Sequence, residues 1–337
     1  MSNSEWLKTI AIMVIVQTTF GCINVFFKLA QNDGMIVRVI VAYRFIFASC
    51  FLIPVSLLLE RKAKHMISKS VIFQAFLCSL FGGPLSQILY LESLEYTTCT
   101  FASAMMNLIP GITFVLAALL RIEKVGLVKV AGTLTAIAGA MIITFLKGFP
   151  LNIPPTHINV LRSSTKNTAV SSHRNLIAGA AFGLASCMSF SIWLIIQSKM
   201  LKKFPYPYTA TALTATIAAV FSSGFALCFD RDRADWALGL NIRLASVAYA
   251  GIVVSGISFS LMTWCLQLSS PLFVSSFYPL MLIVSAISGT LFLGEKLLFG
   301  SVLGSLIIII GLYLVLWGKY KDLMSSVESK ESSRCLT

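Results

Sequence analysis

The most constraining feature of this sequence is a repeat, because the second half of the chain matches the first at one constant offset. The offset is the 172 positions from Glu123 to Glu295. Each copy has a long apolar segment, a short Glu-Lys turn and a second apolar segment with two glycines. The shared positions are Glu123-Lys124, Gly132 and Gly139 in the first copy, and Glu295-Lys296, Gly304 and Gly311 in the second. Such a repeat predicts a fold made of two related halves.

The composition excludes a water-soluble fold. Hydrophobic residues make up 57% of the chain, charged residues only 12%, and the mean hydropathy is +0.86. Soluble domains carry about 25% charged residues. We therefore expect an all-α polytopic membrane protein that lies in a lipid bilayer.

Ten segments are long and apolar enough to cross a membrane, which takes about 20 residues. They are 7–29, 36–59, 71–91, 99–120, 127–146, 176–198, 208–229, 244–266, 272–293 and 299–317. The first five form a repeat over 7–146 and the last five a repeat over 176–318. Residues 147–175 read as a polar linker, and residues 319–337 as a polar, disordered cytoplasmic tail.

The distribution of Lys and Arg sets the orientation. With the N-terminus in the cytoplasm, the inner segments carry more Lys and Arg than the outer ones, which supports two cytoplasmic termini. Five helices per half is an odd number, so the second half must enter the membrane inverted. The Glu-Lys turn agrees: it has Arg121, Lys124 and Lys129 in the first copy but only Lys296 in the second. Inverted repeats place a transported substrate near mid-membrane, where the halves meet.

Polar residues inside apolar spans are costly unless they are paired or face a cavity. The candidates for substrate binding on this ground are Arg44, Gln17, Asn24, Gln87, Asn107, Trp193, Gln197 and Tyr278. Gln17 with Asn24, and Trp193 with Gln197, share a helix face, which favours a cavity. Any of the amides can instead bond to a neighbouring helix. The spans 127–146 and 299–317 carry closely spaced small residues and no such groups, so we interpret them as scaffold.

Arg44 is the most informative of these residues. It lies about 12 Å inside its helix, and no span contains Asp or Glu. A guanidinium without a protein carboxylate suits a substrate carboxylate, because Arg is a two-pronged donor. The alternative is a structural role, with Arg44 reaching outward to Glu92 or Glu95.

Other function classes find little support. The three histidines lie in polar loops and the cysteines lack metal-ligand spacing, so we expect no cofactor and no metal. No catalytic motif is present, so we expect no enzyme. The net charge of +13 is spread over inner loops, which argues against a nucleic-acid partner. With no acidic or histidine relay in the spans, a facilitator is favoured over a proton-coupled carrier.

Several stretches in order resemble the plant branch of the drug/metabolite transporter superfamily with two EamA-type repeats. They include Asp33-Gly34-Met35 before Tyr43-Arg44, Tyr96-Thr-Thr-Cys-Thr-Phe-Ala-Ser103, Asn107-Leu-Ile-Pro110, Trp193 with Gln197, Tyr206-Pro207-Tyr208, and Phe292-Leu-Gly-Glu295. Together they are similar to the walls-are-thin-related (nodulin-like, UMAMIT) proteins over about residues 7–320.

The resemblance implies export or exchange of small molecules, either amino acids or an auxin-like indole carboxylate. It implies residence in the plasma membrane or the vacuolar membrane. A metabolite receptor and a passive channel stay open as alternatives, and so does a homo-oligomer.

Overall fold

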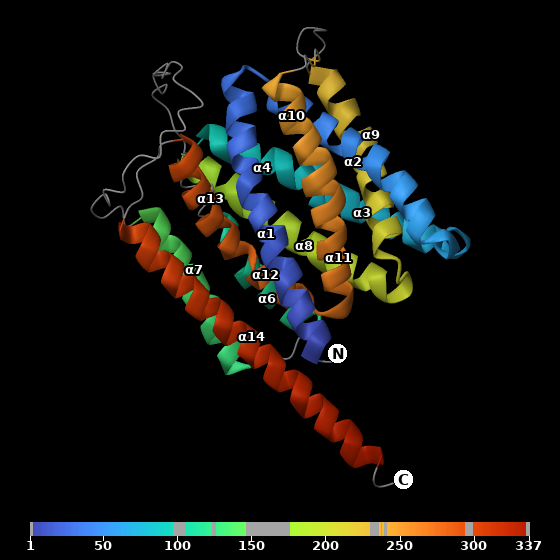
Figure 1. Cartoon of the computed structure of the whole chain (residues 1–337), viewed down its shortest axis with the longest axis vertical. Coiled ribbons are helices and arrows are strands. Elements are labelled where there is room, and N and C mark those ends of the chain that lie inside the picture. The colour runs from blue at the N-terminus through green and yellow to red at the C-terminus, as the bar shows by residue number, and fades with distance from the viewer. Residues whose placement is uncertain are drawn as a thin grey trace.

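The computed structural model describes residues 3–96, 105–122, 126–145, 176–229, 236, 238, 241–293 and 299–334. These residues form helices and no strand, arranged as one bundle (Figure 1). The first half has α1 (Asn3–Asn32), α2 (Val37–Leu59), η1 (Arg61–Met66), α3 (Lys69–Gly82), α4 (Pro84–Tyr96), α6 (Ile109–Leu119) and α7 (Leu127–Phe145). The second half has α8 (Leu176–Lys203), α9 (Pro207–Phe229), α10 (Ile242–Ala248), η2 (Tyr249–Ser258), α11 (Phe259–Leu268), α12 (Pro271–Ser276), α13 (Tyr278–Leu293) and α14 (Phe299–Arg334).

The helices confirm an all-helical membrane protein with several spans. Within the described residues, six stretches are long and apolar enough to cross a bilayer: Glu5–Ile23, Val37–Leu59, Lys69–Tyr90, Ile177–Lys203, Pro207–Phe229 and Ile242–Leu268. The total of ten stays a prediction. The linker at 147–175 and both Glu-Lys turns lie outside the described residues.

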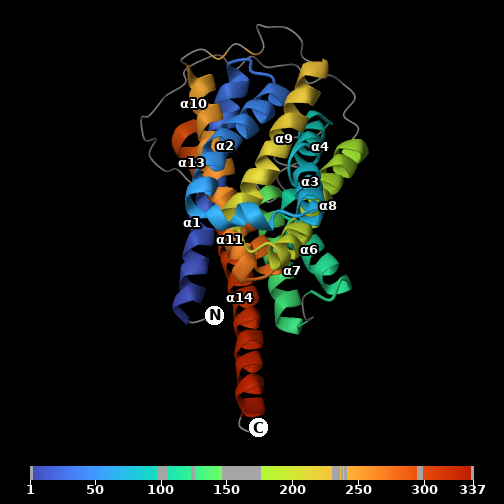
Figure 2. The same ribbon diagram turned by 90° about the vertical axis from the view of Figure 1, so that its right-hand side faces the viewer.

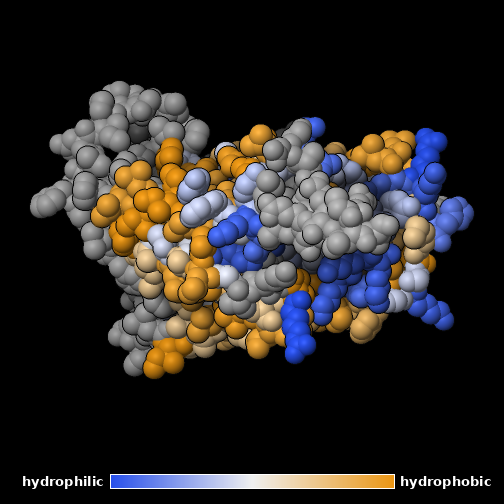
Figure 3. Space-filling view, turned by 90° about the horizontal axis from the view of Figure 1, so that it is seen from below, coloured by the Kyte–Doolittle hydropathy of each residue, from blue (hydrophilic) through white to orange (hydrophobic). Residues whose placement is uncertain are grey.

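Hydrophobic side chains cover much of the outside, where lipid would contact them. Seen from the end at which the termini lie, hydrophobic residues predominate on the left and along the lower edge, and hydrophilic ones gather at the centre and to the right (Figure 3). Large apolar side chains such as Phe73, Ile177 and Val220 are exposed. So many exposed apolar side chains are unlike the surface of a soluble protein and suit a lipid surround.

Several of the expected spans are interrupted, including that at 99–120, where a turn at Asn107 and Leu108 precedes α6. The break at Gly82-Gly83-Pro84 divides the span at 71–91 into α3 and α4, as its sequence predicts. The prediction of a single helix at 272–293 was wrong, because α12 ends at Ser276 and α13 begins at Tyr278. Pro279 has no N–H to donate to the preceding turn, which weakens the helix there. The span at 244–266 is also irregular, since a π-helix, η2, separates α10 from α11.

The expectation of a disordered tail from residue 319 was wrong as well. Helix α14 continues through Arg334 and projects beyond the bundle (Figure 2). A helix already formed in the membrane propagates cheaply into a segment without Gly or Pro. The extension is also tied to the bundle, because the buried Lys129 on α7 donates to Asp322 at 2.6 Å.

Helices α7 and α14 pack side by side along one edge of the bundle (Figure 1). A Cβ added to Gly132 would lie 2.8 Å from the Gly311 carbonyl oxygen, and one added to Gly139 would lie 2.8 Å from the Gly304 carbonyl oxygen. The first glycine of one helix therefore meets the second glycine of the other, and the two helices run antiparallel. Small residues allow this close backbone approach.

We predict that Gly311→Ala destabilises the protein, because the added Cβ would lie 2.4 Å from the Ala136 backbone nitrogen. We expect a loss of about 2 kcal/mol, the usual range for overpacking. The matched control is Gly224→Ala, since a Cβ at Gly224 meets nothing within 4 Å. Thermal unfolding of the detergent-solubilised proteins would measure both. Equal melting temperatures for the two variants would contradict the close packing.

Candidate functional site

Arg44 lies inside the bundle on α2 and is only 5% exposed. Its Nε donates a hydrogen bond to Ser255 Oγ at 2.5 Å. The guanidinium carbon lies 5.7 Å from the ring centre of Phe45 and 5.8 Å from that of Phe259, within cation–π range. Among the described residues, no carboxylate forms an ion pair with Arg44. The guanidinium thus has a hydroxyl and two aromatic faces for neighbours.

Arg44 forms no outward ion pair among the described residues. Asp33, the nearest acid in sequence, is engaged elsewhere: it accepts a bond from Arg243 Nε at 2.6 Å. Glu92 forms no bond with Arg44 among the described residues. The Glu95 side chain lies outside the described residues. Arg44 instead turns inward, toward η2.

The π-helix η2 brings Ser255 to Arg44. A Cβ on Gly251 would lie 2.8 Å from the Arg44 carbonyl oxygen, so only glycine lets η2 approach α2 this closely. Ser255 follows on the same side, where its hydroxyl reaches Nε. π-Helical turns inside α-helices are frequent at functional sites.

A small cavity lies next to this pair, between α2, α3, α8, α9 and the η2–α11 segment. Its volume of about 30 Å³ is enough for about two water molecules. Its wall combines aromatic rings, hydroxyls and one amide: Phe45, Trp193, Phe259, Ser79, Thr211, Thr214, Ser255, Thr263 and Gln197. Arg44 borders the cavity through Ser255 and Phe259.

Two polar atoms of the cavity wall have no hydrogen-bond partner among the described residues. They are Gln197 Oε1 and Ser79 Oγ, and both side chains are almost fully buried. Thr211 differs, because its hydroxyl bonds to Pro207 O at 2.8 Å and to Thr263 Oγ1 at 3.2 Å. Unpaired buried polar atoms are costly, so a hydrogen-bonding occupant would stabilise this end of the cavity.

Of the candidates from the sequence, Trp193 and Gln197 line the cavity directly. Tyr278 lies close by: its ring centre is 5.3 Å from that of Phe190, which lies 4.9 Å from Trp193. Four candidates from both halves therefore gather around one place in the bundle.

Three of the other four candidates, Gln17, Gln87 and Asn107, do not line this cavity. Gln17 is fully buried on α1, and neither of its amide atoms has a partner among the described residues. Asn107 is buried before α6 and has a partner, while Gln87 is half-buried on α4. The Asn24 side chain lies outside the described residues.

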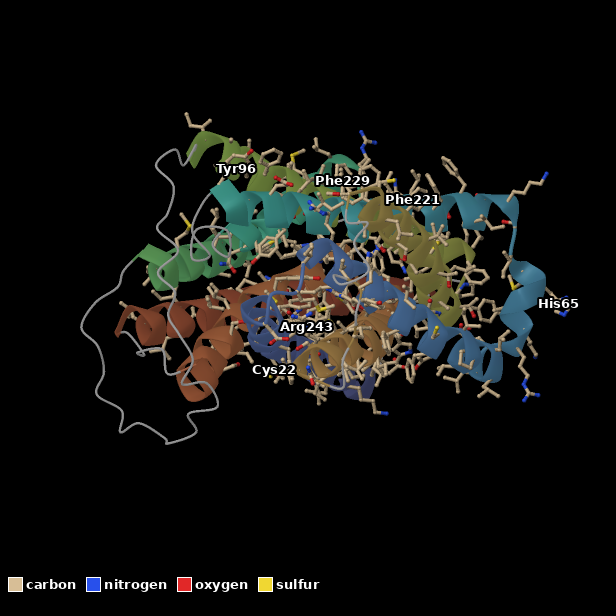
Figure 4. The ribbon with its side chains drawn as sticks, turned by 90° about the horizontal axis from the view of Figure 1, so that it is seen from above. Cys22, His65, Tyr96, Phe221, Phe229 and Arg243 are labelled. Carbon is tan, nitrogen blue, oxygen red and sulfur yellow. The ribbon has the colours of Figure 1, made fainter. Side chains whose placement is uncertain are left out.

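Contacts at the end of the bundle opposite the termini tie α1, α2 and α10 together. Arg243 on α10 lies where the α1 and α10 ribbons meet (Figure 4) and bonds to Asp33. Tyr43 donates to the Trp236 carbonyl at 2.7 Å, and Phe26 stacks on Tyr249 with ring centres 4.7 Å apart. These contacts hold α1, α2 and the α10–η2 segment together at this end.

Sequence reasoning missed Ser255 and the hydroxyl wall. Serine and threonine are common in membrane helices, where they can bond to carbonyls of their own helix. Thr214 does so, donating to Thr211 O at 2.9 Å. The concentration of threonines on α9, at Thr209, Thr211, Thr214 and Thr216, is the signal that could have marked this wall.

Comparison with known proteins gives a consistent result. The sequence profile of the EamA-like transporter family matches residues 7–145 and 177–317. A WAT1-related protein of Arabidopsis thaliana is 38% identical over 96% of this chain and 93% of its own length. Another is 36% identical, over 95% and 92%. The protein WALLS ARE THIN 1 of the same plant is 34% identical over 94% of this chain and 85% of its own length.

A solved crystal structure has the same fold. It superposes with a TM-score of 0.70 at 14% identity, over 95% of this chain and 99% of the other. The family and the names of these relatives indicate a transporter rather than an enzyme. The chain is an integral, multi-pass membrane protein, and it belongs to the EamA-like transporter family as a plant WAT1-related member.

Proposed function

We propose that this protein is a facilitator that exports or exchanges small carboxylates, either amino acids or auxin-like indole acids, by alternating access. Its substrate lies against Arg44 and the adjacent cavity. Ten helices form two inverted five-helix repeats, with both termini in the cytoplasm. The protein resides in the plasma membrane or the vacuolar membrane.

Arg44 is the single observation that carries the proposal. A charged side chain at the centre of a membrane helix costs about 3 kcal/mol. Among the described residues its only hydrogen-bond partner is the Ser255 hydroxyl, which does not neutralise the charge. A carboxylate arriving with the substrate would supply the missing countercharge and two acceptors.

The cavity wall supports either class of substrate. An amino acid would offer its ammonium to Gln197 Oε1, an acceptor without a partner among the described residues. An indole acid would stack on the rings of Trp193 and Phe259 and offer its N–H instead. Both are larger than two water molecules, so the transport cycle must include a state in which the cavity widens.

The packing of α7 on α14 supports the inverted arrangement. The glycines that correspond in the repeat meet in exchanged order, as expected for two copies related by a twofold axis. The N- and C-terminal ends also lie at the same end of the bundle (Figures 1 and 2). An even number of spans accounts for that.

We predict that oocytes expressing the protein release preloaded labelled amino acids or indole-3-acetic acid with saturable kinetics. Arg44→Gln should lower this efflux at least tenfold at equal surface expression, because the carboxylate loses its bidentate partner. The matched control is Arg38→Gln, six residues nearer the beginning of the same helix. This variant should transport normally. Equal loss in both variants, or efflux retained in Arg44→Gln, would contradict substrate binding by Arg44.

The same cells separate a carrier from a passive channel. Unlabelled substrate outside should accelerate release of labelled substrate from a carrier, because the loaded carrier returns faster than the empty one. Efflux that neither saturates nor responds to outside substrate would favour the channel.

We predict opposite locations for the linker and the termini. Epitope tags at either terminus should be reached by antibody only after permeabilisation of cells that carry the protein in the plasma membrane. A tag within 147–175 should be reached in intact cells, because five spans precede it. A linker tag on the same side as the termini would contradict the inverted repeat.

A further inference from the structure

The hydrogen bond between Arg44 and Ser255 uses one particular nitrogen of the guanidinium. Ser255 Oγ accepts from Nε at 2.5 Å, and the two terminal Nη atoms have no hydrogen-bond partner among the described residues. Both residues are buried, with Ser255 only 3% exposed. The bond therefore forms away from bulk water, where it holds the guanidinium plane in one orientation.

The choice of nitrogen decides how a carboxylate can bind. A guanidinium binds a carboxylate bidentately either from the side, through Nε and one Nη, or end-on, through both Nη atoms. With Nε engaged by Ser255, the sideways mode is blocked. The end-on mode remains, with both Nη atoms directed at one ligand.

The backbone of η2 is built to keep Ser255 in this place. The segment contacts α2 at Gly251, Ser255 and Gly256, where Gly251 meets Phe47 and the Arg44 backbone and Gly256 meets Phe51. Ser255 and Gly256 follow Gly251 by four and five residues, and this spacing fits the wider turn of a π-helix. Ser255 also lines the cavity, so it contacts both the guanidinium and the space next to it that a ligand would occupy.

We propose that Ser255 is the positioning residue for Arg44: its hydroxyl holds Nε so that both terminal nitrogens bind the substrate carboxylate end-on. This inference rests on the proposed function. It adds that affinity for the carboxylate depends on a second residue, which contributes orientation rather than charge.

The experiment compares KM and Vmax for efflux of indole-3-acetic acid and of a labelled amino acid in single and double variants. Ser255→Ala should raise KM about tenfold, the effect of losing one charge-assisted hydrogen bond, with little change in Vmax. Ser255→Thr keeps the hydroxyl and should restore a wild-type KM. In an Arg44→Gln background, Ser255→Ala should add nothing, since no guanidinium is left to position.

The matched control is Ser258→Ala in the same helix. Ser258 is equally buried, but its hydroxyl pairs with Thr19 at 2.7 Å and not with Arg44. Its KM should equal that of the wild type. An equal rise in KM for Ser258→Ala, or no rescue by Ser255→Thr, would reduce Ser255 to a structural role and overturn the inference.

Two further outcomes separate this inference from the proposed function. A wild-type KM in Ser255→Ala, with transport lost in Arg44→Gln, overturns the positioning role alone. Unchanged kinetics in Arg44→Gln overturn both, because Arg44 would then not bind the carboxylate.

Discussion

A guanidinium held in a membrane bundle by a hydroxyl is the constraint on which the account of this protein depends. Burying the charge costs about 3 kcal/mol, and a hydrogen bond to a charged group returns about 2 kcal/mol. The bond from Arg44 to Ser255 therefore compensates only part of the cost, and the cation–π contacts with Phe45 and Phe259 offset roughly the remainder. A residue that contributes so little to stability is best explained by what it binds.

Two irregular segments of the bundle border the cavity, whereas the close-packed pair α7 and α14 lies apart from it. The pair α7 and α14 packs through reciprocal glycines along one edge and contributes nothing to the cavity wall. The break at Gly82-Gly83 and the π-helix η2 both lie in that wall. Irregular backbone is tolerated in membranes mainly where it lines a cavity or is covered by protein. The irregularities thus lie where a substrate would pass.

Much of this fold could be predicted from the sequence. Apolar length predicted an all-helical membrane protein and the six spans that the described residues contain. Glycine spacing predicted that 127–146 and 299–317 pack closely. Each of these depends on composition or spacing along one helix. The other spans and the two inverted halves stay predictions. Breaks within the spans were harder to predict. The sequence Gly83-Pro84 marks one of them, whereas the interruption before Pro279 and the π-helix were not predicted. A π-helix depends on tertiary contacts, here the approach of Gly251 to Arg44.

The candidate site was only partly predictable, because the role of some of its residues depends on contacts between helices. Arg44, Trp193, Gln197 and Tyr278 stand out because charged, amide and large aromatic groups are rare or informative in an apolar span. Ser255 carries a common side chain, and only its distance from Nε reveals a special role. The helical extension of α14 also needed a contact between helices, that of Lys129 with Asp322.

The most direct test of the central claim is the thermal stability of Arg44→Met beside its transport activity. Methionine is apolar and of similar length, and replacing buried charged groups by such residues is often neutral or stabilising. The account predicts a purified variant that melts at or above the wild-type temperature and carries no substrate. A variant that unfolds well below the wild type would show that Arg44 holds the bundle together, and would contradict its role as the substrate's partner.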